Sequence, residues 1–91
     1  DGNSGTLQAT IDLGSAYHGI NHLWFDSVRS RIYATARNSD RLVVYDLTTA
    51  SVTAALAVGS HPDDVAVLGN TIYVSNFDGN SVSLFNANDL S

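Results

Sequence analysis

The chain has 91 residues and a formal net charge of −5 at pH 7, with nine acidic residues, four basic residues and no Cys. Every acid is Asp and every base is Arg, so the chain lacks the clustered basic residues that nucleic acid or an anionic membrane would require. The absence of Cys excludes disulfides and thiolate metal sites, and no apolar run approaches the ~20 residues of a membrane span.

The composition predicts an all-β fold. Lys, Glu and Met, which are among the better helix formers, are absent, whereas Val, Thr, Ser, Asn and Gly are abundant. Eight short segments have the apolar patterns that strands require. In chain order they are Leu7–Leu13, Leu23–Phe25, Ile32–Ala36, Leu42–Tyr45, Val52–Val58, Val65–Leu68, Ile72–Ser75 and Val82–Phe85.

The segments differ in how many faces they are expected to bury. Leu7–Leu13 alternates apolar and polar residues, which predicts a strand with one wet face, and Val52–Val58 follows that pattern less strictly. Leu23–Phe25 and Val65–Leu68 are continuously apolar, so we expect them to be buried on both faces.

The eight segments are two copies of one pattern. Placing Ile32 on Ile72 gives an offset of 72 − 32 = 40 residues, and Tyr45 then falls on Phe85. A period of this length with four short strands per unit is typical of β-propeller blades. The sequence therefore predicts a disordered or tag-like N-terminus at residues 1–5, a first propeller repeat at residues 6–50 and a second at residues 51–91.

The strand order predicts an incomplete ring. In a blade the strand buried on both faces lies innermost and the half-wet strand lies outermost, so the chain begins on an outer strand and ends on a third strand. We therefore expect an all-β fold of two four-stranded blades, offset so that the ring closes only with other copies or with the rest of a longer chain.

The second repeat resembles the YVTN β-propeller family. Gly59–Val67 is similar to the family's V-G-x-x-P-x-x-V-A-V segment, and Tyr73-Val74-Ser75-Asn76 differs from the Y-V-T-N tetrad only by Ser for Thr. The first repeat is more divergent, with Tyr33-Ala34-Thr35-Ala36 at the tetrad. The resemblance implies a ring of six to eight blades, commonly in an extracellular or cell-surface protein. It says little about function, because propeller families host surface-layer proteins, lactonases, lyases and binding scaffolds.

One rim of the expected ring collects the polar residues that could carry chemistry. The turns from outer to inner strand and from second to third strand open on the same face, around the mouth of the central channel, and all three His lie there. The opposite rim receives Arg29, Arg31 and Asn70. The candidate ligand-binding residues at the channel mouth are His18, Asn21, His22, His61, Asp63 and Asp64.

Three interpretations of this rim remain open. Imidazole and carboxylate groups suit zinc or another divalent metal, which is the candidate cofactor. The same His residues could act as acid–base groups near neutral pH, although no nucleophile or catalytic residue can be assigned. The third interpretation is structural, with Asp and Asn side chains closing turns; the turn Asp78–Asn80 is then expected to hold Gly79 at positive φ.

The sequence favours a binding or scaffold module, with three copies forming a six-bladed homo-oligomer and a small molecule or protein bound at the channel mouth. The alternative is a segment of a propeller lactonase or lyase with a metal-assisted site there. A third hypothesis, a two-sheet sandwich, is disfavoured by the two continuously apolar segments, because a sandwich strand keeps one polar face. Trp24, Phe25 and Tyr33 are expected to pack between blades.

Overall fold

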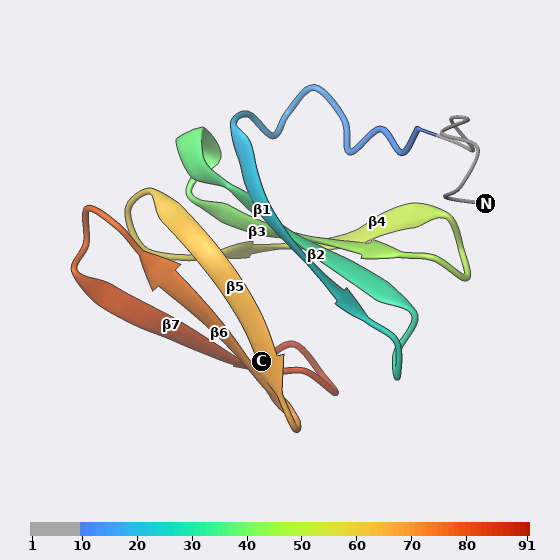
Figure 1. The fold of residues 1–91 in the computed structure, drawn as a ribbon. Helices are drawn as coiled ribbons and strands as arrows, with labels where there is room; N and C mark the ends of the chain where they lie inside the picture. Colours follow the sequence, from blue (N-terminus) through green and yellow to red (C-terminus); the bar gives the residue numbers. More distant parts are fainter. Residues whose placement is uncertain (1–9) are drawn as a thin grey trace, which may run out of the picture.

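The computed structural model describes residues 10–91, which form seven strands, one 3-10 helix (η1) and no α-helix (Figure 1). No helix in this part of the chain has the length and apolar character that a membrane span requires. The elements are β1 (Ile20–Asp26), β2 (Arg31–Ala36), η1 (Arg37–Ser39), β3 (Arg41–Asp46), β4 (Ser51–Ala57), β5 (Pro62–Leu68), β6 (Thr71–Asn76) and β7 (Ser81–Asn86).

The strands form two antiparallel sheets, so the all-β prediction is confirmed. Sheet A has the order β1-β2-β3-β4 and sheet B has the order β5-β6-β7. Seven of the eight predicted segments are strands, with bounds shifted by a few residues. In the eighth segment, Thr10–Leu13 is not a strand and Leu7–Ala9 lies outside the described residues. The predicted disordered or tag-like region at residues 1–5 also lies outside them.

The 40-residue period is visible in the backbone as well as in the sequence. Asp40 and Asn80 both adopt left-handed φ values, of 53° and 51°, and Ala50 and Leu90 do so at 54° and 62°. The prediction of a positive φ at Gly79 was wrong, because Asn80 takes that conformation instead. Asn and Asp tolerate the left-handed region better than other residues with a Cβ, which explains why the turn does not need its glycine there.

Each sheet has two faces, which can be named by one pair of neighbouring residues. We call the side that carries Tyr33 in sheet A, or its counterpart Tyr73 in sheet B, the Tyr face, and the side that carries Ile32 or Ile72 the Ile face. Successive side chains of a strand point to opposite sides, and partner residues on neighbouring strands share a side. The register therefore assigns the regularly paired strand residues to one of the two faces.

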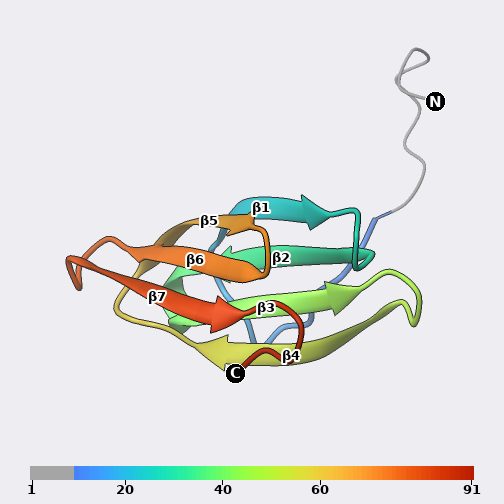
Figure 2. The same cartoon turned by 90° about the horizontal axis from the view of Figure 1, so that it is seen from below.

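The main core lies where the Tyr face of sheet A packs on the Ile face of sheet B. Figure 2 shows the two sheets with β1 beside β5. Tyr33, Ile72 and Val74 are completely buried at this interface. The other buried members of this core are Leu42, Val44, Val65 and Ala87.

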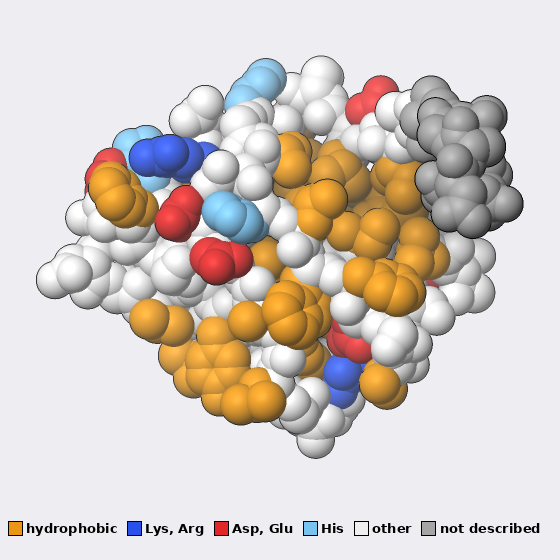
Figure 3. Space-filling model, in the orientation of Figure 1, with side chains coloured by type: hydrophobic (Ala, Val, Ile, Leu, Met, Phe, Trp, Pro, Cys, Tyr) orange, Lys and Arg blue, Asp and Glu red, His pale blue; other side chains and the backbone are white. Residues whose placement is uncertain are grey.

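A second, smaller core lies on the Ile face of sheet A. Leu13 and Tyr17, from the segment before β1, pack against Ala34, Ala36 and Val43. The segment covers the β2–β3 part of this face and leaves a groove of about 610 Å³ toward β1. Figure 3 shows hydrophobic side chains gathered over a broad area of one face of the molecule.

The prediction that Leu23–Phe25 is buried on both faces was wrong for this chain. Leu23 and Phe25 are each 62% exposed and Trp24 is 38% exposed. All three lie on β1, an edge strand. Leu23 and Phe25 lie on the Ile face of sheet A, which has no second sheet over it among residues 10–91. Of the three aromatic residues expected between blades, only Tyr33 is fully buried. In β5, Val65 is buried but Leu68 is 74% exposed.

Two valine substitutions test where the core lies. Val74→Ala should lower the free energy of unfolding by about 2 kcal/mol, because it leaves a cavity between the sheets. Val28→Ala, in the turn between β1 and β2 and 85% exposed, should change it by less than ~0.5 kcal/mol. Urea denaturation of dilute protein measures both, and equal costs would contradict the assignment of the core.

Candidate functional site

The loops at one end of the sheets gather the residues expected at the channel mouth. The turn formed by η1 lies at the centre of this loop end. On one side, the Arg37 backbone N–H donates to the Gly19 carbonyl at 2.9 Å and that of Asn38 donates to His18 at 3.1 Å. On the other side, the carboxylate of Asp40 accepts from the His61 backbone N–H at 2.9 Å. The loop end is thus tied together mainly by backbone groups.

Asn21, His22 and Asp63 form a group of side-chain hydrogen bonds at the loop end. The Asn21 side-chain amide donates to the Asp63 carboxylate at 2.6 Å and to its carbonyl at 3.2 Å. His22 Nδ1 lies 2.7 Å from the same carbonyl, and the Thr35 hydroxyl donates to it at 3.3 Å. Because Asn21 and His22 lie on β1 and Asp63 lies on β5, these bonds join sheet A to sheet B.

The contact with Asp63 fixes the tautomer of His22. A carbonyl oxygen can only accept, so Nδ1 carries the proton and donates it. In this tautomer the Nε2 atom is a hydrogen-bond acceptor that could bind a metal. His22 is exposed, so its ring can be reached from solvent.

The other predicted residues are placed differently. The His61 ring pairs with the carboxylate of Asp78, and both side chains are about half exposed. Asp64 accepts from the backbone N–H of Val65 at 2.8 Å, while its own N–H donates to Ser75. The His18 backbone N–H donates to the Ser39 hydroxyl at 3.0 Å. The six candidates thus share one end of the molecule but do not converge on a single point.

The side chains at the loop end do not form the divalent metal site that the sequence left open. Within residues 10–91, no group of three or more His, Asp or Glu side chains is arranged to hold a metal ion. His22 turns its Nδ1 to a backbone carbonyl, and the imidazole of His61 is used by Asp78. The described residues of a single chain therefore offer paired contacts at this end, not a metal centre.

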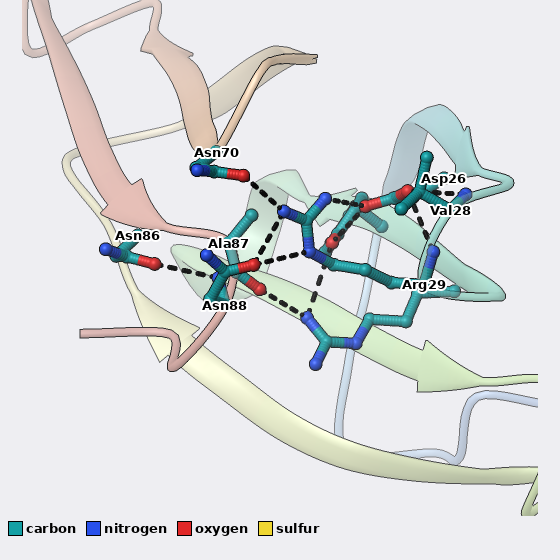
Figure 4. A network of polar contacts seen from close by, with 9 residues as sticks. Asp26, Val28, Arg29, Asn70, Asn86, Ala87 and Asn88 are labelled. Carbon is teal, nitrogen blue, oxygen red and sulfur yellow. Dashed lines mark hydrogen bonds and ion pairs between the residues drawn. The ribbon is translucent and has the colours of Figure 1, made fainter.

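Sequence reasoning missed a polar network at the opposite end of the sheets (Figure 4). The carboxylate of Asp26, only 5% exposed, accepts from Arg29 Nη1 at 3.0 Å and from the Tyr33 hydroxyl at 2.9 Å. Arg29 in turn donates to the side-chain oxygens of Asn70 and Asn88 at 2.9 and 2.8 Å. Asp26 and Arg29 belong to the β1–β2 hairpin, whereas the two Asn flank strands of sheet B, so the network fixes one sheet against the other.

A second arginine strengthens the same junction. Arg31 Nη1 donates to the Ala87 carbonyl at 2.8 Å and contacts the Tyr33 hydroxyl at 3.5 Å. The signal in the sequence was two of the four arginines beside one turn, together with an Asp that ends an apolar strand. The sequence placed Arg29, Arg31 and Asn70 on one rim but gave no partner for them.

The network sets the ionisation of its two acids. Burial raises the pKa of Asp26, but hydrogen bonds from Arg29 and Tyr33 outweigh it and hold this pKa below its ordinary value of 3.8. Burial raises the pKa of Tyr33 above its ordinary 10.0, so its hydroxyl stays protonated and donates to Asp26. Because the pKa of Asp26 is lower in the folded state, its ionised carboxylate stabilises the fold at any pH above the pKa of the unfolded state. This contribution is lost as the pH falls through the pKa of the folded state.

Comparisons with known proteins identified no relative of the chain. No family model matches the chain, and searches of the curated proteins and of the solved structures found no match.

Removing the charge of Asp26 should weaken the junction of the sheets. Asp26→Asn should lower the free energy of unfolding at pH 7 by about 2 kcal/mol, because Arg29 then faces a neutral partner in a buried site. The wild type should lose stability faster than the variant as the pH falls below about 4. Chemical denaturation across pH 2.5–7 measures both effects.

Asp46→Asn is the matched control for this experiment. The Asp46 carboxylate accepts backbone N–H groups of its own turn, from Thr48 and Thr49, as Asp26 does from Val28 and Arg29. An Asn side-chain oxygen can accept the same bonds, so stability should change by less than ~0.5 kcal/mol. Equal losses for the two variants would contradict the role of the cross-sheet network.

The bond from His22 to Asp63 gives a second test. His22→Ala should lower the free energy of unfolding by about 1 kcal/mol, and His22→Asn, which keeps a donor near the Nδ1 position, should recover part of that loss. His18→Ala should cost less, because the hydrogen bonds described for His18 use its backbone N–H and carbonyl. Thermal unfolding of the three variants measures the order, and a larger loss for His18→Ala would contradict it.

Proposed function

We propose that the chain is a binding and scaffold module of the β-propeller type. In this proposal sheets A and B are two neighbouring blades, and further copies close the ring, with three copies giving six blades. The observation that carries the proposal is that both outward faces of the pair of sheets carry large exposed apolar side chains. Leu23 and Phe25 are each 62% exposed on one side, and Leu84 is 58% exposed on the other.

The apolar outer faces argue against a self-sufficient two-sheet sandwich. A sandwich of two sheets buries its inner faces and leaves polar residues on the outer ones. Here Leu68, Tyr73, Val82 and Leu84 lie on the Tyr face of sheet B and are between 36% and 74% exposed. Patches of this kind mark surfaces that associate with other protein.

The free edge of sheet B also supports assembly. Within residues 10–91, β6 is the only strand that pairs with β7, so sheet B has three strands where sheet A has four. By the repeat, β7 corresponds to β3, which pairs with β4. The alternating segment at residues 6–13 corresponds to β4 in the pattern, so in a ring this segment of a neighbouring copy supplies the fourth strand.

The loop end would then surround the mouth of the channel. The exposed ring of His22 and the paired His61 and Asp78 offer hydrogen-bonding groups to a small molecule or a protein ligand there. Likeness to the YVTN repeat adds the expectation of an extracellular or cell-surface location. No arrangement of the described residues favours the alternative of a metal-assisted lactonase or lyase.

The mass of the assembly tests the proposal. Native mass spectrometry of the folded chain should give three times its 9.6 kDa mass, and dilution should dissociate the complex cooperatively. A folded chain that remains monomeric at high concentration would contradict the proposed function. A mass of four chains would keep the scaffold and change the number of blades to eight.

A further inference from the structure

The two repeats contact each other through opposite faces. The 40-residue offset places Tyr33 on Tyr73 and Ile32 on Ile72. In the interface between the sheets, however, Tyr33 of sheet A is fully buried together with Ile72 of sheet B. The contact therefore joins a Tyr face to an Ile face, and one face of each kind remains outside: the Ile face of sheet A and the Tyr face of sheet B.

Apolar residues of the existing interface have apolar counterparts on the two outward faces. On the Tyr faces, Tyr33, Leu42 and Val44 of sheet A correspond to Tyr73, Val82 and Leu84 of sheet B. On the Ile faces, the register of β1 and β5 places Leu23 and Phe25 of sheet A at the positions of Val65 and Val67 of sheet B. The outward faces thus repeat the chemistry of a contact that the chain already makes.

The sizes of the side chains are also complementary. Where the Tyr face of sheet A carries Trp24, that of sheet B carries Ala66, and a hollow of about 340 Å³ lined by Ala66, Tyr73 and Val82 opens there. The Ile face of sheet A carries bulkier side chains on β1 than the Ile face of sheet B carries on β5, because Leu23 and Phe25 occupy the positions of Val65 and Val67. A hollowed Tyr face therefore fits the bulky Ile face, whereas two identical faces would set bulk against bulk or hollow against hollow.

We infer that the Tyr face of sheet B is the docking surface for the Ile face of sheet A of a second copy of this chain. The inference rests on the proposed assembly and names its two contact surfaces. Such a contact is heterologous: each copy uses two different surfaces, and repetition produces a ring when the rotation between copies closes. It excludes a dimer in which two copies present the same face to each other.

Docking has a consequence for the segment before β1. Leu13 and Tyr17 of this segment pack on Ala34 and Val43 of the Ile face of sheet A. The residue equivalent to Ala34 in sheet B is Val74, which the existing contact between the sheets buries completely. A second copy that covers the same part of the Ile face occupies the place of this segment. The segment is thereby displaced from the face and becomes available for the free edge of β7.

Two variants, each with one blocked face, test the assignment. Leu84→Asp places a charge on the Tyr face of sheet B, and Phe25→Asp places one on the Ile face of sheet A. Each side chain is more than half exposed, so both variants should fold, as far-UV circular dichroism will show. Val28→Asp, in an exposed turn outside both faces, is the matched control and should assemble as the wild type does.

The expected result is a pattern that only a heterologous contact produces. Each blocked variant alone should be monomeric in native mass spectrometry. Their equimolar mixture should give a heterodimer of one chain of each kind, joined by the intact Ile face of Leu84→Asp and the intact Tyr face of Phe25→Asp. If either substitution unfolds the chain, Val82→Asp or Leu23→Asp blocks the same face instead.

Other outcomes overturn the inference in distinguishable ways. If one blocked variant alone forms a homodimer, copies join through identical faces, and the assignment fails while the assembly stands. If both variants assemble as the wild type does, neither named face carries the contact. If each variant is monomeric and their mixture stays monomeric too, the two faces are needed for assembly but do not meet each other, and the assignment fails. If the wild type itself is monomeric, the faces serve another partner, and the proposed assembly fails together with the inference.

Discussion

The rest of the structure depends on the packing of one sheet's Tyr face on the other sheet's Ile face. Successive side chains of a strand point to opposite faces of the sheet, so a single contact between two sheets can bury only one face of each. Tyr33, Ile72 and Val74 are buried by that contact, whereas Leu23, Phe25 and Leu84 are left in water. Exposed apolar area of this kind is unfavourable by about 25 cal/mol per Å², which gives the outward faces a strong tendency to associate.

Two polar clusters hold this packing at opposite ends of the strands. Asn21 and His22 reach from β1 to Asp63 at the loop end, and Arg29 reaches from the β1–β2 hairpin to Asn70 and Asn88 at the other end. Hydrogen bonds depend on direction, whereas apolar packing does not. The two clusters therefore set the relative orientation of the sheets, and in a closed ring that orientation decides how many blades fit.

Local pattern in the sequence was sufficient to predict the strands but not their burial. Alternation and the 40-residue offset located seven strands, because both signals can be read along the chain without knowing which strands pair or which sheets pack together. The apolar run Leu23–Phe25 predicted a strand buried on both sides, yet the sequence of the run does not show which other part of the protein covers each side. The hydrogen bonds of Asp26 and His22 depend on how the two sheets pack on each other, which the sequence pattern does not show. The positive φ expected at Gly79 is found at Asn80, because both of these adjacent turn residues tolerate that conformation.

Contact between copies through unlike faces is the central claim, and isotope-filtered nuclear Overhauser spectroscopy measures it most directly. In an assembly that mixes labelled and unlabelled chains, filtered cross-peaks arise only between protons of different copies. The account predicts interchain cross-peaks from Tyr73 or Leu84 to Leu23, Phe25 or Ile32. Interchain cross-peaks between Tyr73 and Tyr73, or between Phe25 and Phe25, would contradict it.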